Sequence, residues 1–408
     1  MTITVIGAQW GDEGKGKIVD FLAEQADDVV RFSGGANAGH TIIRDGEKFT
    51  LHLVPSGILY PNTVVTLGIG MVIDVPSLFQ ELDTLESQGI QWKGRVLVSD
   101  RAHVLLPGDR EEDKRLDASR RLPIGTTGRG IGVAYARKAA RDGVRVCDLV
   151  DDETFAKLSA DEQAHFQPYR DRLKRMSSDL SDRMHSHQGR RILLAGAQGV
   201  MLDLDFGTYP YVSCGMSSSG GAALGGGIGP RRIDRVIGVF KAYSTRVGNG
   251  PFPSEFLVER DGDLGERVQT IGHEFGATTG RPRRCGYLDL VALRYAVRTN
   301  SIDGLVLTKL DIYDSFDEIA VCTGYTIEGK TWRTVPASLR QYEQAVPVIE
   351  RLPGWQRSTA NASRYEDLPA RAQDYIRFIE SFVEAPIDIV SVGSSRDQTI
   401  IRRTPWKA

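Results

Sequence analysis

A glycine-rich segment near the start of the chain has residues suited to binding phosphate. Residues 11–17 read Gly-Asp-Glu-Gly-Lys-Gly-Lys and lie between the strand-like residues 3–6 and an apolar helical pattern that begins at Ile18. A turn between a strand and a helix presents free backbone N–H groups to an anion, and Lys15 and Lys17 add positive charge. The segment differs from the usual phosphate loop, because no Ser or Thr follows Lys15 and the glycine spacing is different.

Asp12 is an unusual residue for such a turn, since its carboxylate would repel phosphate. A carboxylate at this position suits proton transfer or metal binding. The same residues could also form a solvated surface loop of mixed charge. The segment therefore indicates nucleotide binding and leaves the role of Asp12 open at this point.

Three later loops carry further polar groups. In residues 33–41, Asn37 can contact the polar edge of a ligand, and His40 titrates near neutral pH as either a proton donor or a structural hydrogen-bonding residue. Residues 125–132 offer hydroxyl and backbone N–H groups for a second phosphate. Residues 276–284 contain three arginines, whose planar guanidinium groups match carboxylates and indicate a small acidic substrate. A solvated or nucleic-acid-facing patch is the alternative for that loop.

A short polar segment follows a later apolar run. Thr308-Lys309-Leu310-Asp311 comes at the end of residues 305–308. The carboxylate of Asp311 can accept hydrogen bonds from N1–H and the N2 amine of guanine, while the stem of Lys309 covers the ring. Adenine has neither donor. The tetrapeptide therefore favours GTP over ATP, although so short a pattern also arises by chance.

The elements that must position these loops alternate along the chain. Apolar runs predict strands, whereas residues 75–88 and 288–298 have helical spacing, which together predict an α/β fold with a mainly parallel central sheet flanked by helices. The tail predicts a helix, a strand at 387–392 and a final hairpin or strand. We expect a single domain over residues 1–408 with a helical excursion at about 151–189. The core strands are expected at residues 3–6, 29–32, 64–67, 95–98, 192–195, 236–239 and 305–308.

Composition argues against several classes of protein. The 408 residues are 41% hydrophobic and 25% charged with a net charge of −2, which is typical of a globular protein and gives no electrostatic case for nucleic-acid or membrane binding. No apolar run reaches the ~18 residues that span a bilayer, and the N-terminus lacks the basic and apolar regions of a signal peptide. Four scattered cysteines without metal-ligand spacing indicate free thiols and a cytoplasmic location.

Taken in order, these segments and several others make the chain resemble the adenylosuccinate synthetase family. The resemblance implies the adenylosuccinate synthetase fold, in a homodimer that is related to phosphate-loop GTPases. Such an enzyme joins L-aspartate to IMP with GTP and Mg²⁺ and releases GDP and phosphate, in purine biosynthesis. Aspartate would displace phosphate from a 6-phosphoryl intermediate. The matching motifs run from Gln9 to Gly393 and include residues 9–17, 37–41, 125–132, 196–199, 207–212, 241–248, 276–281 and 308–311.

The resemblance also assigns chemical roles. It makes Asp12 the base that removes the N1 proton of the purine, and a magnesium ligand together with the backbone carbonyl of Gly39. His40 would be the acid that assists phosphoryl transfer to O6, and Lys15 would neutralise the charge that moves. Gln198 would belong to this catalytic group and lie beside the purine.

The remaining assignments concern binding. Arg141 would reach the phosphate of the purine nucleotide from the neighbouring subunit, so the active site should require a dimer. GTP would contact Gly11, Asp12, Glu13, Gly14, Lys15, Gly16, Lys17, Gly39, His40, Thr41, Arg283, Lys309, Leu310, Asp311, Ser391, Val392 and Gly393. The purine nucleotide and aspartate would contact Asn37, Ala38, Thr127, Arg141, Gln198, Ser213, Ala277, Thr278, Thr279, Gly280, Arg281 and Arg283.

The match to the family weakens around the purine. Ala36 stands where a polar side chain is usual, Ala195 replaces the usual Glu, and residues 213–219 (Ser-Cys-Gly-Met-Ser-Ser-Ser) replace Thr-Ser-Ser-Asn-Thr-Thr-Ala. These changes either are neutral or fit a purine with a 2-amino group, as in related phage enzymes that make 2-aminoadenylosuccinate from dGMP. Asp12 and the GTP-selective tetrapeptide are intact, so we favour IMP. A GTP-binding switch without ligase activity is a third alternative, against which the aspartate-type loop argues.

Overall fold

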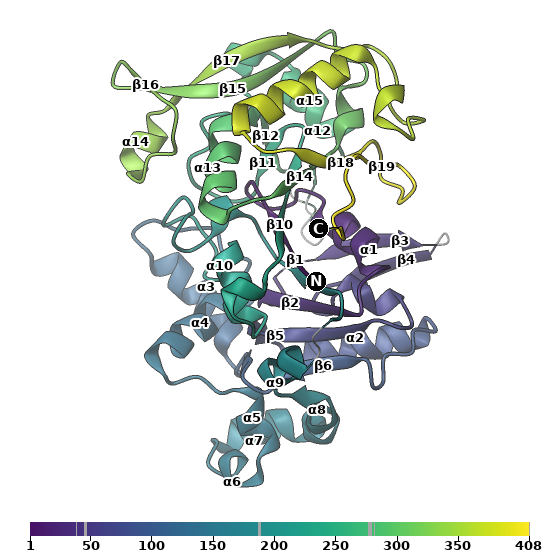
Figure 1. The fold of residues 1–408 in the computed structure, drawn as a ribbon. Coiled ribbons are helices and arrows are strands. Elements are labelled where there is room, and N and C mark those ends of the chain that lie inside the picture. Colours follow the sequence, from purple (N-terminus) through teal and green to yellow (C-terminus); the bar gives the residue numbers. More distant parts are fainter. Residues whose placement is uncertain (38, 45–46, 187–188, 276–279, 281, 408) are drawn as a thin grey trace. The chain divides into compact units, whose positions relative to one another are not determined.

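The chain folds into two compact units, each assembled from separated segments. The first unit comprises Met1–Val5, Ile18–Gln198 and Ser213–Asp234, and the second comprises Ile6–Lys17, Gly199–Val212 and Arg235–Ala408. The structure, a computed structural model, describes residues 1–37, 39–44, 47–186, 189–275, 280 and 282–407, and at positions 40, 41, 43, 44 and 48 the backbone alone (Figure 1). The single domain over residues 1–408 stays a prediction.

The first unit is built on a parallel sheet. The strands β1, β9 and β2 are buried along their length, as expected for parallel strands covered on both faces. In register, Arg31 lies between Ala195 and Leu67. A separate antiparallel hairpin pairs β3 (His40–Arg44) with β4 (Glu47–Leu51). The order of the sheet is β1 (Thr2–Gly7), β9 (Ile192–Ala195), β2 (Asp28–Gly34), β5 (Val64–Ile73), β6 (Val96–Ser99) and β8 (Ser177–Ser178), and β7 (His103–Val104) also pairs with β5.

Helices accompany this sheet, and α2 (Val75–Ser87) illustrates how they form. Asp74 caps its N-terminus by accepting a hydrogen bond from the backbone N–H of Ser77, and Pro76 lies in the first turn, where its missing N–H costs nothing. The apolar residues of α2 are buried at helical spacing. The other helices are α1 (Lys15–Ala23), α3 (Asp109–Ser119), α4 (Ile131–Ala140), α5 (Val146–Val150), α6 (Asp152–Phe155), α7 (Ala160–Phe166), α8 (Arg170–Met176), α9 (Leu180–Ser186) and α10 (Ser219–Gly225), with 3₁₀ turns η1 (Ser56–Leu59), η2 (Gln167–Tyr169) and η4 (Pro230–Arg232).

The second unit has parallel strands of its own. They are β10 (Arg235–Lys241), β14 (Gly304–Thr308) and β18 (Ile387–Ser391), and β19 (Thr399–Ile401) runs antiparallel to β18. Lys241 pairs with Thr308, and Leu307 pairs with Val390. The carboxyl ends of the three strands therefore meet at one edge, which is where ligands bind in open α/β sheets.

An antiparallel sheet also belongs to the second unit. Its central strand β15 (Glu318–Ile327) pairs with β16 (Lys330–Trp332), β17 (Val346–Pro353) and, in parallel, β13 (Leu288–Asp289). A core that includes Trp10, Phe252 and Tyr325 packs beside it. The short strands β11 (Ser244–Arg246) and β12 (Arg284–Gly286) form an antiparallel pair. The helices are α11 (Val258–Asp261), α12 (Leu264–Ile271), α13 (Leu290–Asn300), α14 (Leu339–Glu343) and α15 (Ala370–Val383), with η3 (Val200–Leu202), η5 (Leu310–Tyr313) and η6 (Tyr365–Asp367).

The expected fold class is confirmed: helices flank mainly parallel strands (Figure 1). Every expected strand overlaps an observed one, α2 and α13 take up the expected helical segments, and the tail forms α15, β18 and β19. The hairpin β3–β4 and the antiparallel sheet around β15 are absent from the expectation, because their strands mix polar residues and glycine with apolar ones. In the part of the chain that the structure describes, no helix is both long and apolar enough to cross a membrane.

A glycine in α10 gives a prediction about stability. A Cβ atom at Gly225 would overlap the carbonyl oxygen of Phe32 in β2. We expect Gly225→Ala to lower the free energy of unfolding by about 1–3 kcal/mol, because α10 must move away from β2. Urea unfolding followed by circular dichroism measures the loss. Gly229→Ala is the matched control, since nothing lies within 4 Å of a Cβ atom there, and equal losses in the two variants would contradict this packing.

Candidate functional site

The buried side chain of Glu13 shapes the phosphate loop of the second unit. Its Oε1 accepts hydrogen bonds from the backbone N–H groups of Gln9 (3.1 Å) and Gly11 (2.9 Å), and its Oε2 pairs with the ammonium group of Lys15. The hydroxyl of Thr308 donates to the carbonyl oxygen of Glu13 at 2.6 Å. The loop is therefore organised around its own carboxylate and fastened to the end of β14.

Asp12 is the exposed acid of this loop. It has a left-handed backbone with φ of 57°, which a non-glycine residue adopts only where its surroundings hold it. Its side chain is 44% exposed, and its Oδ2 lies 2.7 Å from Nε of Arg283. Two residues that the sequence analysis assigns to the substrates are thus in contact in the second unit.

Lys17 joins the phosphate loop to the turn that follows β18. Its Nζ donates to Oγ of Ser391 (2.7 Å) and to the carbonyl oxygens of Gly393 (2.9 Å) and Gln398 (3.0 Å). Burial lowers the pKa of Lys17 to about 8, against the opposing charge of Asp311 and of a second carboxylate. The structure therefore brings together three segments that the sequence analysis assigned to GTP.

Asp311 presents a buried acceptor that no group in the described part of the chain satisfies. Its Oδ1 has no hydrogen-bond partner there, and burial raises the pKa of its carboxyl group. A buried acceptor without a donor is costly, so a ligand that brings a donor is favoured. The neighbouring Lys309 adopts φ of 61° and donates from Nζ to the carbonyl oxygen of Gly272 at 2.8 Å. The N1–H and N2 amine of guanine are donors of the required kind.

The first unit carries the residues assigned to the purine nucleotide. Oδ1 of Asn37 accepts from the N–H of Gly35 at 3.2 Å, and the buried Arg31 donates to the carbonyl oxygen of Gly35 at 2.8 Å, so this loop is fixed at its base. Gln198 has φ of 58° and a buried Oε1 without a partner among the described residues. A Cβ atom at Gly34 would lie 3.5 Å from that oxygen. Asn37 and Gln198 therefore lie near the same stretch of backbone.

Three further residues of this group lie in the first unit. Thr127 is exposed in a loop whose backbone N–H groups donate to Asp113 and Asp117. Ser213 accepts from a nearby backbone N–H at 3.4 Å. Arg141 is exposed directly after α4, with φ of 66°.

The departures from the family pattern have distinct environments. Ala36 and Ala195 are buried, and Met216 is exposed. The side chain of Cys214 packs beside Tyr135 against a small apolar core, and burial raises the pKa of its thiol to about 11. Cys214 is therefore a partly buried residue that packs against this core. That core consists of Val72, Leu105, Ile131 and Ala134.

Part of the expected site lies outside the described residues. This holds for Ala38, Ala277, Thr278, Thr279 and Arg281 and for the side chains of His40 and Thr41. Asp12 belongs to the second unit and Gly39 to the first. Within the described ranges, no group of three or more His, Cys, Asp or Glu residues could hold a metal ion. The metal site at Asp12 and Gly39 stays a prediction.

Two buried ions beside Arg283 are not predicted from the sequence. Glu274 and Lys241 are both fully buried and pair with each other. Lys241 lies in a matched motif and Glu274 lies two residues before the aspartate-type loop at 276–284, but neither position reveals a partner. The one signal in the sequence that could have indicated Lys241 is its position as a charged residue at the end of a buried apolar strand.

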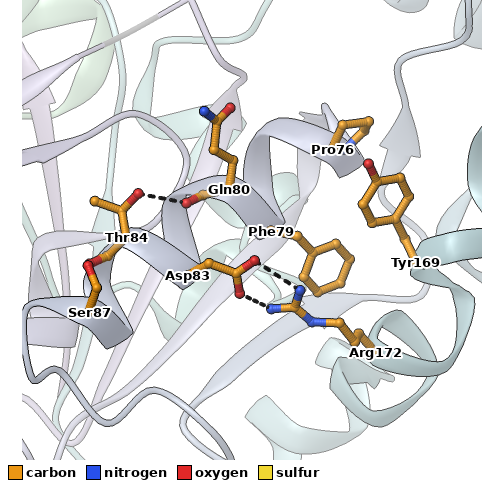
Figure 2. Close-up of a pocket in the computed structure, with 8 residues that line it drawn as sticks. All are labelled: Pro76, Phe79, Gln80, Asp83, Thr84, Ser87, Tyr169 and Arg172. Atoms are coloured by element: carbon orange, nitrogen blue, oxygen red, sulfur yellow. Dashed lines mark hydrogen bonds and ion pairs between the residues drawn. The ribbon is translucent and has the colours of Figure 1, made fainter.

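A hollow of about 540 Å³ in the first unit, lined by residues of α2, η2 and α8, contains none of the site residues described above (Figure 2). The rings of Phe79 and Tyr169 stack in parallel with centroids 5.6 Å apart, and the guanidinium group of Arg172 lies over Phe79. Both oxygens of Asp83 accept from Arg172. The charged groups of this hollow satisfy each other, so it offers a ligand no unpaired charge.

A family model described as adenylosuccinate synthetase matches residues 4–400 of the chain. The chain belongs to the adenylosuccinate synthetase family. This is a family of carbon–nitrogen ligases that uses GTP as a co-substrate. The adenylosuccinate synthetase of Acaryochloris marina is 49% identical over 99% of this chain and 95% of that relative. That of Desulforamulus reducens is 45% identical over 98% of each chain.

Solved structures agree with this membership in the adenylosuccinate synthetase family. The fully ligated adenylosuccinate synthetase from Plasmodium falciparum matches with a TM-score of 0.91 at 37% identity, over 98% of this chain and 99% of that one. A succinoaminodeoxyadenylate synthetase of cyanophage S-2L, bound to dGMP and to dATP as an energy donor, matches with a TM-score of 0.65 at 20% identity, over 99% and 95%. The phage likeness shows the fold alone.

Lys17 gives this family member a testable pH dependence. With a pKa of about 8, its ammonium form is present at pH 7 and largely lost at pH 9, so its three hydrogen bonds weaken as the pH rises. We expect KM for GTP to rise about tenfold between pH 7 and pH 9. Steady-state kinetics of the wild type and of Lys17→Met measure this. The variant should have a raised KM at pH 7 and a smaller rise above it, which separates Lys17 from the ionisation of GTP itself. Identical pH dependence in both proteins would rule Lys17 out.

Proposed function

We propose that this chain joins L-aspartate to C6 of IMP at the expense of GTP, giving adenylosuccinate, GDP and phosphate in purine biosynthesis. The observation that carries the proposal is the GTP-type site of the second unit. There Lys17 links the phosphate loop to the Ser391–Gly393 turn, and Asp311 offers a buried acceptor that lacks a donor. Family membership supplies the reaction, and these residues supply the preference for a guanine nucleotide.

The residues suit a reaction in two chemical steps. Asp12 takes the proton from N1, which makes O6 nucleophilic, and O6 attacks the γ-phosphorus of GTP with GDP as the leaving group. Lys15 and His40 neutralise the charge that develops during this transfer. The amine of aspartate then attacks C6, and phosphate leaves with the O6 oxygen. Gln198, whose Oε1 is buried without a described partner, is suited to orient the purine.

Mg²⁺ is proposed at Asp12 and at the backbone carbonyl of Gly39. The exposed carboxylate of Asp12 and a carbonyl oxygen are the hard donors that this ion prefers. When bound, the ion would neutralise phosphate charge. We place the aspartate substrate at Ala277–Arg283, with Thr279, Arg281 and Arg283 as its main contacts, and the purine nucleotide at Asn37, Ala38, Thr127, Gln198 and Ser213.

IMP is preferred to dGMP as the purine substrate. The curated relatives at 45–49% identity are named for adenylosuccinate, whereas the phage enzyme is far more distant. Cys214, one of the departures from the family pattern, is partly buried against an apolar core of the first unit and has no need to contact a 2-amino group. We further propose a cytoplasmic homodimer in which Arg141 reaches the purine phosphate of the neighbouring subunit, since this side chain is exposed at the end of α4.

Substrate identity is tested by phosphate release with GTP, Mg²⁺ and aspartate, in separate reactions with IMP, GMP and dGMP. We expect release with IMP alone, because the family relatives of comparable sequence are named for adenylosuccinate. Mass spectrometry of the product identifies the succinylated purine. Turnover with dGMP but not IMP would replace this substrate with the phage-type one. Phosphate release that needs neither purine nor aspartate would instead indicate a GTP-hydrolysing switch.

Asp12→Asn tests the base. We expect kcat to fall by about 10²- to 10⁴-fold, because the amide cannot accept the N1 proton, while the dissociation constant for GTP stays within about twofold. Stopped assays and calorimetry measure the two quantities. Glu318→Gln is the matched control, since Glu318 is a similarly exposed carboxylate of the second unit that pairs with Arg351. A variant at Asp12 with nearly wild-type turnover would remove it from this role.

A further inference from the structure

A chain of four charged side chains runs from the interior of the second unit to the phosphate loop. Nζ of Lys241 lies 2.7 Å from Oε1 of Glu274, Oε2 of Glu274 lies 2.7 Å from Nη1 of Arg283, and Nε of Arg283 lies 2.7 Å from Oδ2 of Asp12. Exposure rises along it, from 1% at Lys241 and 0% at Glu274 to 14% at Arg283 and 44% at Asp12. Two cations and two anions balance in charge.

The two contacts of Arg283 differ in kind. Its Nη1 donates a well-directed hydrogen bond to Glu274, whereas its buried Nε has an ion pair with Asp12 but no aligned hydrogen bond. The backbone agrees, because the N–H of Arg283 donates to the carbonyl oxygen of Glu274 at 2.9 Å. Glu274 therefore anchors the guanidinium group, and the contact with Asp12 can be exchanged for another anion.

Glu274 is itself held as an anion. Burial opposes its ionisation, but the positive charge of Lys241, hydrogen bonds from Lys241 and Tyr243, and the charge of Arg283 outweigh burial and lower its pKa to about 2. The hydroxyl of Tyr243 donates to Oε1 of Glu274 at 2.6 Å. A buried carboxylate that stays charged at all neutral pH values gives Arg283 a permanent partner.

The same group is fastened to the start of the phosphate loop. The side chain of Gln9 accepts from the N–H of Lys241 at 3.0 Å and donates to the carbonyl oxygen of Tyr243 at 3.0 Å. Gln9 also donates its backbone N–H to Glu13, the residue that organises the loop. The position of Asp12 and that of its cation are therefore set by one connected set of hydrogen bonds.

We propose that Glu274 is a positioning residue for the ligation, which holds Arg283 beside Asp12 so that Nε of its guanidinium group can exchange Asp12 for a carboxylate or phosphate of the substrates. Lys241 and Tyr243 keep Glu274 charged and in place. This inference rests on the proposed function of Asp12 and Arg283. Without Glu274, Asp12 would be the one anion beside Arg283 in the described network. The guanidinium group would then pair fully with Asp12, and neither residue could act on the substrates.

The test separates positioning from stability with a paired substitution. Glu274→Gln alone leaves Lys241 buried without an anion, so a loss of folding would be ambiguous. The double variant Glu274→Gln with Lys241→Met removes both charges at nearly constant volume. We expect it to unfold at a temperature near that of the wild type, while kcat/KM for aspartate falls about 10- to 100-fold, the usual effect of losing a residue that orients a functional group. KM for IMP should change less than twofold.

A second pair of variants needs no change in charge. Tyr243→Phe removes a buried hydroxyl that donates to Glu274, and Tyr325→Phe removes one that donates to the buried Asp289 of the same unit. We expect a several-fold loss of kcat/KM for aspartate in Tyr243→Phe and none in Tyr325→Phe. GTP affinity gives a measurement that is independent of turnover. In calorimetry, we expect the double variant Glu274→Gln with Lys241→Met to bind GTP more weakly than the control Tyr325→Phe.

The outcomes are decisive in each case. A folded double variant with wild-type kcat/KM for aspartate and wild-type GTP affinity would overturn the inference and leave the ligase function intact. If the double variant does not fold, equal activities of Tyr243→Phe and Tyr325→Phe would overturn it. Absence of IMP-dependent phosphate release in the wild type would instead refute the proposed function. The GTP affinity of the double variant, compared with that of Tyr325→Phe, would then decide whether Glu274 positions Arg283.

Discussion

The carboxylate of Glu13 is the interaction on which the nucleotide site of the second unit depends. It takes two backbone N–H groups of its own loop, holds Lys15, and keeps the loop beside Thr308 at the end of β14. In a loop that binds phosphate, several backbone N–H groups point toward the same space. The positive ends of their dipoles repel one another because they lie close together. An internal anion relieves that repulsion and so stabilises the shape of the loop.

Charge is arranged around this loop in two layers. The inner layer is buried and paired, as in Glu13 with Lys15 and Glu274 with Lys241. The outer layer, Asp12 with Arg283, is partly exposed and held by a less well-directed contact. Buried ion pairs are weak contributors to stability. Beside the carboxylate of Asp12, we infer that their role is to fix the positions of the neighbouring side chains. In the proposed role of Glu274, the exposed pair can therefore exchange partners while the fold stays fixed.

Much of this site could be predicted from the sequence, because strand ends carry it. The phosphate loop follows a strand, and Thr308–Asp311 follows another, so the periodic apolar runs located both. The contacts of Lys17 with Ser391 and of Lys241 with Glu274 could not be found, since each joins side chains far apart in sequence through tertiary packing that has no local signature. Cys214 shows the same limit, because its partial burial beside Tyr135 depends on how α4 packs rather than on its neighbours in the sequence.

The two units are interleaved along the chain, with boundaries on either side of the segment Ile6–Lys17 and again after Gln198, Val212 and Asp234. A gene with this layout cannot be cut into two independent modules, because any truncation or exchange of a single contiguous half would carry away parts of both cores. Recombination with an unrelated domain is therefore restricted to surface loops. The family should consequently diversify by substitutions and by changes in loop length.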